Sequence, residues 1–150
     1  MPEKRVLDRR GFLVGLGGLA AWGTLRAAFA QETAPQCTFG LVTDVQYCDC
    51  DPGGVRFYRN AIGKLRTCVA AFNGAPLDFA IQLGDLVDRE MESFEPVLAE
   101  FAKLTMPLHH ALGNHDFPGG YRNAAAIYAK LGCTPGYYDF THGPWRFVVL

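Results

Sequence analysis

The sequence predicts an α/β fold in which helices flank a parallel β-sheet. Short apolar stretches that end in turn-forming residues alternate with longer segments whose apolar residues recur every three or four positions. Strands that alternate with helices in this way are typical of a parallel sheet with right-handed crossovers. The last part of the chain has a different pattern, and it predicts an antiparallel hairpin.

The elements follow one another in a regular order. Residues 37–44 predict the first strand, and a loop rich in turn formers follows it. Residues 56–73 predict a helix with one apolar stripe, which Asn73-Gly74 ends. The remaining predictions are strands at 77–85 and 107–114, helices at 91–104 and about 123–131, and a hairpin over 137–150 that turns at Gly143-Pro144.

Composition and charge limit the classes of function. The chain has 150 residues, of which 49% are hydrophobic and 13% aromatic, so it can bury a core and forms one domain at most. The net charge of −1 gives no sign of binding to nucleic acid or to an anionic membrane surface. Residues 31–150 carry 9 basic and 13 acidic residues, a mildly favourable balance for binding cations.

Residues 1–30 predict an export signal. Basic residues precede an uncharged stretch over 11–25, and Ala28-Phe29-Ala30 has the small-x-small pattern of a signal peptidase site. The Arg9-Arg10 pair, followed by Gly-Phe-Leu, resembles a bacterial twin-arginine signal. A general secretory signal and an uncleaved anchor are the alternatives. We expect a mature chain of residues 31–150 in the periplasm or secreted, with no membrane contact after cleavage.

Five cysteines cannot all pair within one chain. Cys48-Asp49-Cys50 suggests a soft-metal site, but zinc sites usually have two such pairs or added histidines. The favoured interpretation is a loop with two thiols, or with one bridge to a distant cysteine. No function follows from the cysteines.

Each of the three predicted parallel strands ends in a hard oxygen donor, namely Asp44, Asp85 and Asn114. The carboxyl ends of parallel strands meet at one edge of a sheet, where ligands bind. Each residue alone is explained as a helix cap or a turn residue. Together they predict a site for Mn²⁺, Mg²⁺ or Ca²⁺, and an added imidazole would allow Fe or Zn.

Three short blocks, TDVQ (43–46), GDLVDR (84–89) and GNHD (113–116), resemble the signature blocks of the binuclear, calcineurin-like metallophosphoesterases. That family usually has Asp-x-His in the first block, and Gln46 stands here in place of the histidine. This departure, together with RFYRNAIGKL (56–65), resembles the manganese-dependent ADP-ribose/CDP-alcohol diphosphatases. The resemblance covers roughly 39–150. It implies the N-terminal half of a metallophosphoesterase-type β-sandwich flanked by helices.

The resemblance also implies two divalent metal ions, Mn²⁺ in the first place, with Fe or Zn as alternatives. Asp44 and Gln46 would bind the first metal, and Asp85 would bridge both. Asn114 would bind the second metal through its amide oxygen.

Four further residues receive roles from the same resemblance. His115 would contact the substrate phosphate, as general acid or as donor to the developing charge. Asp116 would orient that histidine. Asp88 and Arg89 would form an ion pair that steadies the loop without touching a metal.

The implied activity is hydrolysis of the pyrophosphate bond of ADP-ribose, CDP-alcohols or related nucleoside diphosphate compounds by a metal-activated water. Another phosphodiesterase or phosphomonoesterase of the superfamily is the alternative. The family also has later histidines, including a Gly-His-x-His block, and no such block occurs in these 150 residues. We therefore expect either a piece of a longer protein, because residues 147–150 read as a strand in mid-course, or a truncated half-domain that catalyses nothing.

Several other polar and aromatic side chains leave two interpretations open. His109 and His110 alternate along the third strand, and His142 in the hairpin is expected to be solvated. The alternatives for the aromatic residues Tyr47, Tyr58 and Phe117 are a base or ribose pocket and packing in the core or at its rim. Those for Arg56 and Arg59 are contact with a diphosphate and a solvated helix face.

Overall fold

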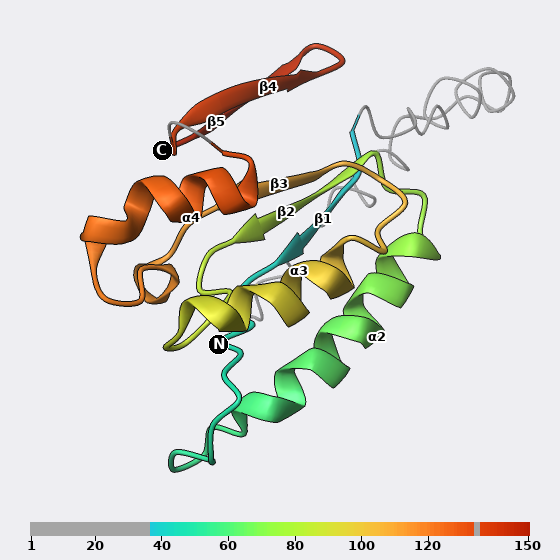
Figure 1. Cartoon of the computed structure of the whole chain (residues 1–150). Coiled ribbons are helices and arrows are strands. Elements are labelled where there is room, and N and C mark those ends of the chain that lie inside the picture. Colours follow the sequence, from blue (N-terminus) through green and yellow to red (C-terminus); the bar gives the residue numbers. More distant parts are fainter. Residues whose placement is uncertain (1–36, 134–135) are drawn as a thin grey trace, which may run out of the picture. The chain divides into compact units, whose positions relative to one another are not determined.

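The structure is a computed structural model that describes residues 37–133 and 136–150 (Figure 1). The predicted export signal, residues 1–30, lies outside the described residues. A three-stranded parallel sheet has the order β1-β2-β3, formed by Phe39–Val42, Phe79–Leu83 and Leu108–Ala111. In its register, Phe39 lies opposite Phe79, and Ala80 lies opposite Leu108. The predicted parallel sheet is confirmed.

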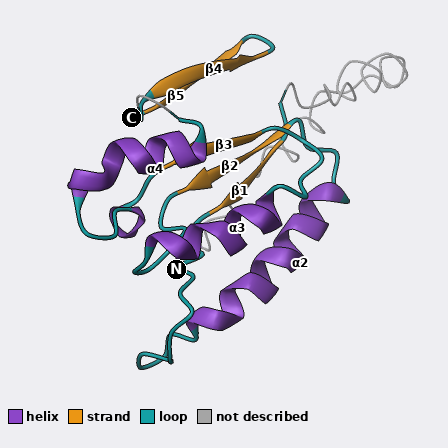
Figure 2. Cartoon of the chain, in the orientation of Figure 1, coloured by secondary structure: helices purple, strands orange, loops and turns teal. Residues whose placement is uncertain are grey.

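The helices also follow the prediction, and Figure 2 shows how they alternate with the strands. They are α2 (Ala61–Asn73), α3 (Phe94–Phe101) and α4 (Ala124–Leu131). Each starts later than its predicted range, because a 3₁₀ turn forms its first residues: η1 (Tyr58–Asn60), η2 (Met91–Ser93) or η4 (Tyr121–Asn123). None of the helices in the described ranges has the length and apolar character needed to cross a membrane.

The two faces of the parallel sheet have different partners, because successive side chains of a strand point to opposite faces. Gly40 faces α2, and a Cβ atom there would come within 2.7 Å of the Phe72 ring. His110 also faces the helices, with its ring 6.2 Å from that of Phe101 in α3. On the opposite face, His109 stacks on Phe140 of the hairpin at 3.4 Å. The sheet therefore lies between the helices and the hairpin.

The hairpin consists of β4 (Tyr138–His142) and β5 (Trp145–Val149), which pair antiparallel as predicted. The Tyr138 hydroxyl accepts a bond from the backbone N–H of His110 and donates one to its carbonyl, both at 2.8 Å. These bonds attach the hairpin to β3. The arrangement of a parallel sheet, helices and a second sheet is the predicted α/β class.

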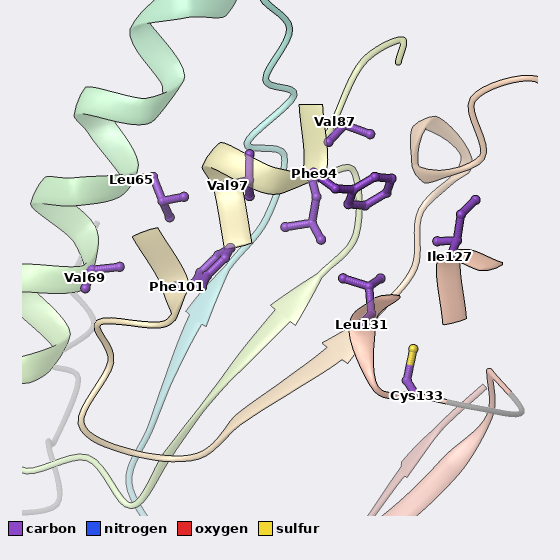
Figure 3. Close-up of a cluster of buried hydrophobic side chains, with 10 residues drawn as sticks. Leu65, Val69, Val87, Phe94, Val97, Phe101, Ile127, Leu131 and Cys133 are labelled. Atoms are coloured by element: carbon purple, nitrogen blue, oxygen red, sulfur yellow. The ribbon is translucent and has the colours of Figure 1, made fainter. Parts of the chain in front are cut away.

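The core cluster of the described residues joins the three helices to the loop after β2 (Figure 3). Its members are Leu65, Val69, Leu86, Val87, Phe94, Val97, Phe101, Ile127, Leu131 and Cys133. Leu86 and Val87 are fully buried and directly follow Asp85. Their burial fixes the loop that carries this carboxylate, so the core also positions the site.

The loop after β1 contains a disulfide between Cys48 and Cys50, whose Cα atoms are 5.2 Å apart. The favoured sequence interpretation, two thiols or a bridge to a distant cysteine, is therefore wrong. A chain reversal between the two residues brings their Cα atoms into the range that a disulfide needs. Cys37, Cys68 and Cys133 are free thiols.

Candidate metal centre

The first three predicted metal ligands lie in loops that run side by side beyond the carboxyl ends of β1 and β2. The backbone N–H of Asp44 donates to the carbonyl of Gly84 at 3.1 Å, and that of Gln46 donates to the carbonyl of Asp85 at 2.8 Å. A parallel bridge between Tyr47 and Val87 continues this pairing. The two loops thus extend the sheet, and they bring Asp44, Gln46 and Asp85 together.

The side chains of these three residues converge. The Gln46 amide nitrogen Nε2 lies 3.4 Å from Asp44 Oδ1 and 3.4 Å from Asp85 Oδ2. The other oxygen of Asp44 accepts a bond from the Thr43 hydroxyl at 2.7 Å, and that of Asp85 accepts one from the His115 N–H at 3.0 Å. Each carboxylate therefore has one oxygen held by the protein and one directed at the shared amide.

The backbone is strained at the same three positions. Asp44, Gln46 and Asp85 have φ angles of 56°, 45° and 55°. Among the residues that the structure describes, they are the non-glycine residues with positive φ. Such a conformation costs about 1–3 kcal/mol per residue and occurs mainly at active sites and ligand clamps. The strain therefore marks the same place as the convergent side chains.

Two glycines allow the loop after β3 to approach the loops after β1 and β2. Gly84 has φ 102°, and a Cβ atom on it would overlap with the backbone of Gly113. A Cβ atom on Gly113 would overlap in turn with the Asp85 carboxylate. The chain then forms the 3₁₀ turn η3 (Asn114–Asp116). Asn114 is exposed, and within residues 37–133 no hydrogen bond joins its side chain to the other three predicted ligands.

Asp116 has a different contact from the predicted one. It is fully buried, and its carboxylate accepts hydrogen bonds from four backbone N–H groups, those of Gly113, Asp85, Leu86 and Val87, at 2.6–3.4 Å. Burial raises the pKa of Asp116, against the opposing effect of these donors. Its predicted role, orienting His115, stays a prediction; the contacts that the structure shows hold the loops after β2 and β3 together.

The contact expected of Asp116 is made by Asp88. The His115 atom Nδ1 lies 3.1 Å from Asp88 Oδ1, and the Asp88 side chain is 7% exposed. The predicted ion pair is present as well, since Arg89 Nε lies 3.2 Å from Asp88 Oδ2. Arg56 adds a second guanidinium at 3.6 Å. Asp88 therefore links the imidazole to two cations, which the sequence interpretation did not foresee.

A hollow of about 400 Å³ opens beside Asp44 and Gln46. Its other walls come from the segment before α2 and from α2 itself, and include Arg56, Phe57 and Lys64. Tyr58 also borders it but is mostly buried, with the Arg89 guanidinium 5.5 Å from its ring. The hollow joins Asp44 and Gln46 to a wall with both basic and aromatic side chains.

The remaining aromatic and basic candidates pack or pair locally. Tyr47 and Phe117 lie against the core, and Phe117 also contacts the Tyr121 ring at 4.6 Å. Arg59 forms ion pairs with Asp49 and Asp51 at 2.5 and 3.0 Å.

The other histidines stand apart from the predicted ligands. His109 and His110 point to opposite faces of β3, as expected, and His110 Nδ1 lies 3.3 Å from Gln82 Oε1. His142 is half-buried and contacts the Phe79 ring, so the expectation of a solvated side chain is wrong.

Comparison with known proteins gives a consistent result. The family model for calcineurin-like phosphoesterases matches residues 37–148. A manganese-dependent ADP-ribose/CDP-alcohol diphosphatase from Oryza sativa subsp. japonica is 34% identical over 137 residues, covering 81% of this chain and 42% of the relative. The protein of the same name from Arabidopsis thaliana is 35% identical over 131 residues, with 77% and 42% covered.

The fold also resembles a solved structure, a dimetal phosphatase from Danio rerio, with a TM-score of 0.67 at 27% identity. The match covers 77% of this chain and 44% of that protein. The chain thus spans less than half the length of the curated relatives and of the solved structure that it matches.

Proposed function

This chain belongs to the calcineurin-like phosphoesterase family, and from that premise we propose that the full-length protein is a metal-dependent phosphohydrolase. Its reaction is cleavage of the pyrophosphate bond in a small nucleoside diphosphate compound. The observation that carries this proposal is the meeting of Asp44, Gln46 and Asp85 in strained backbone conformations at one edge of the sheet.

The donor set fits divalent metal ions. Two carboxylates, each with one oxygen directed at a shared amide, form a group of hard donors of the kind that Mn²⁺ prefers. The two carboxylates contact the same amide, so a divalent cation beside them would reduce the repulsion between their like charges. Asn114, which begins η3 on the third loop, is the proposed ligand of a second metal. We propose Mn²⁺ as the metal in both positions.

When bound, a pair of divalent metals would supply an activated water and neutralise charge on the phosphoryl oxygens. The protein groups supply position and proton control. His115 is the proposed donor to the phosphate or to the leaving oxygen, because its imidazole is partly exposed and lies against the Asp88 carboxylate. Asp116 keeps the loop of Asp85 against that of His115 through its four backbone contacts.

The proposed substrates are ADP-ribose and CDP-alcohols. The names of the plant relatives and the position of Gln46 support this choice. The hollow beside the carboxylates supports it too, because Arg56 and Lys64 suit a diphosphate and the 58% exposed Phe57 suits a base or ribose. The second candidate is a phosphodiesterase or phosphomonoesterase of the same family. The basic side chains of the hollow would suit the phosphate group of a diphosphate, a phosphodiester or a phosphomonoester alike.

The test uses the full-length protein with Mn²⁺ and a panel of ADP-ribose, CDP-choline, a phosphodiester and a phosphomonoester. We expect hydrolysis of the first two, with AMP or CMP as product. Asp85→Asn should lower kcat by at least about a hundredfold and reduce the Mn²⁺ content. The matched control is Asp139→Asn, which removes a carboxylate from the hairpin ion pair with Arg146 and should leave both values unchanged.

The outcomes separate the alternatives. Hydrolysis of monoesters but not of ADP-ribose would exclude the proposed substrate class and favour the second candidate. Full turnover in Asp85→Asn would exclude the metal centre itself.

A further inference from the structure

Three side chains that the proposed function does not use meet at the amino-terminal edge of the parallel sheet. Cys37 precedes β1, Asp78 immediately precedes β2, and His142 ends β4. One ligand atom from each lies within 4.8 Å of the other two. The three residues are far apart in the sequence, so the fold itself brings the thiol, the carboxylate and the imidazole together.

Two of the three groups are already positioned. The backbone N–H of Thr38 donates to Asp78 Oδ2 at 2.8 Å, while the N–H of Asp78 donates to the carbonyl of Thr38 at 2.7 Å. These reciprocal bonds fix the carboxylate. The His142 ring lies 5.6 Å from that of Phe79, and its Nε2 is 3.5 Å from Asp78 Oδ2. The imidazole therefore points at a carboxylate that cannot turn away freely.

The geometry matches a small tetrahedral metal ion. Zinc bonds of about 2.0–2.3 Å imply separations of about 3.3–3.8 Å between ligand atoms. The imidazole and carboxylate atoms, 3.5 Å apart, already have this spacing. The thiol needs to move by about 1.5 Å at most, given the 4.8 Å limit on the group. Cys37 also borders a hollow of about 360 Å³, so its side chain has room to move.

The donor types favour a different metal from that of the candidate site at the carboxyl ends of the parallel strands. A thiolate, an imidazole and a carboxylate are typical zinc ligands, whereas Asp44, Gln46 and Asp85 are all oxygen donors or amides. The strand segment from Asp78 to Asp85 separates the two places by about 20 Å, so the two sets of side chains cannot share an ion.

We infer that Cys37, Asp78 and His142 form a second metal site, which binds one Zn²⁺ with water as the fourth ligand. Such an ion would join the end of β4 to the starts of β1 and β2, and so tie the hairpin to the parallel sheet. The inference does not depend on the proposed function. If no metal binds, Asp78 and His142 are an ordinary contact between a carboxylate and an imidazole beside a free thiol. The test then gives the opposite result, with no protection of Cys37 by Zn²⁺.

The test measures alkylation of each cysteine by iodoacetamide in the full-length protein, with peptide mass spectrometry and Zn²⁺ alone as the probe. Metal binding occupies the thiolate, which is the reactive form, so we expect one equivalent of Zn²⁺ to slow alkylation of Cys37 at least about tenfold. Cys68 serves as the matched control and should react at an unchanged rate. Buried Cys133 should stay protected as long as the protein is folded.

Variants assign the protection to this site. His142→Ala and Asp78→Asn should each abolish most of the protection of Cys37, while Asp85→Asn at the other edge should leave it intact. Two results would overturn the inference: equal alkylation of Cys37 with and without Zn²⁺, or protection that survives both His142→Ala and Asp78→Asn. Loss of the protection in Asp85→Asn would also overturn the inference, because the ion would then be bound at the candidate metal centre near Asp85.

Discussion

Nδ1 of His115 lies 3.1 Å from Oδ1 of Asp88, a carboxylate with a side chain that is only 7% exposed. The same carboxylate faces Arg89 at 3.2 Å and Arg56 at 3.6 Å. The imidazole therefore lies against a buried carboxylate that also faces two guanidinium groups. Asp88 Oδ1 is buried and has no hydrogen-bond partner among the described residues, so it acts on the neighbouring imidazole through its charge.

Asp88→Asn should lower kcat about 10- to 100-fold while KM and the Mn²⁺ content change little, because the substitution removes the oriented charge and preserves the shape of the side chain. Steady-state kinetics and metal analysis of the full-length protein provide the measurement. Asp51→Asn is the control, since that exposed carboxylate pairs only with Arg59 in the described part of the chain. A parallel loss of metal in Asp88→Asn would assign Asp88 to the metal centre instead.

Asp116→Asn should destabilise the protein by about 3 kcal/mol. An amide in this fully buried position presents N–H donors where the carboxylate now accepts four backbone N–H groups, so buried donors lose their acceptor. Urea unfolding of both forms gives the difference. Asp139→Asn on the exposed hairpin ion pair should change stability by less than about 1 kcal/mol. If the two variants are equally stable, Asp116 does not hold the loops.

Acid should destabilise the fold through His110. Desolvation, with repulsion from His109, lowers the pKa of His110 to about 4, so the folded protein keeps this imidazole neutral. Between about pH 6.5 and 4 the unfolded chain binds more protons than the folded one, and stability falls as the pH falls. The contribution is on the order of 3 kcal/mol at the acid end of this range.

His110→Gln tests this prediction with thermal unfolding at a series of pH values. The variant keeps a polar group near Gln82, with which the imidazole is in contact at 3.3 Å, and lacks the titrating ring. The difference in stability between the two proteins should therefore shrink or reverse as the pH falls from 6.5 to 4. A difference that is constant over this range would contradict the lowered pKa.

Export through the twin-arginine route remains a proposal, and the paired arginines provide its test. Arg9→Lys combined with Arg10→Lys should leave the full-length protein uncleaved in the cytoplasm of its host. The control, Arg26→Lys, makes the same change outside the pair and should be exported normally. Fractionation of the cells is the measurement. Normal export of the double variant would favour a general secretory signal.

Most of the fold was predictable because the hydrophobic periods are clear. The stripe that runs from Tyr58 to Phe72 does face the core side, and Leu65 and Val69 at its centre are almost completely buried. The convergence of Asp44 and Asp85 was also predictable, because strand order in a parallel sheet places both at one edge.

The partner of His115 was not predictable by the same reasoning. The family resemblance assigned this role to Asp116, but successive side chains of a 3₁₀ turn are about 120° apart, so neighbours point in different directions. Asp116 instead lies on the same side as Gly113, three residues earlier, and accepts its N–H. Asp88 reaches His115 only because Gly84 and Gly113 let two loops touch, a contact that no local pattern reveals.

The position of Asp116 affects how variation among relatives should be interpreted. This carboxylate is fully buried, and its four hydrogen bonds connect the loops of Asp85 and His115. Selection for folding would therefore preserve residue 116 as strictly as selection for chemistry preserves residue 85. Conservation among related sequences therefore has two different causes at these two positions. We expect a relative that has lost its activity but still folds to keep Asp116 even where Asp85 has been substituted.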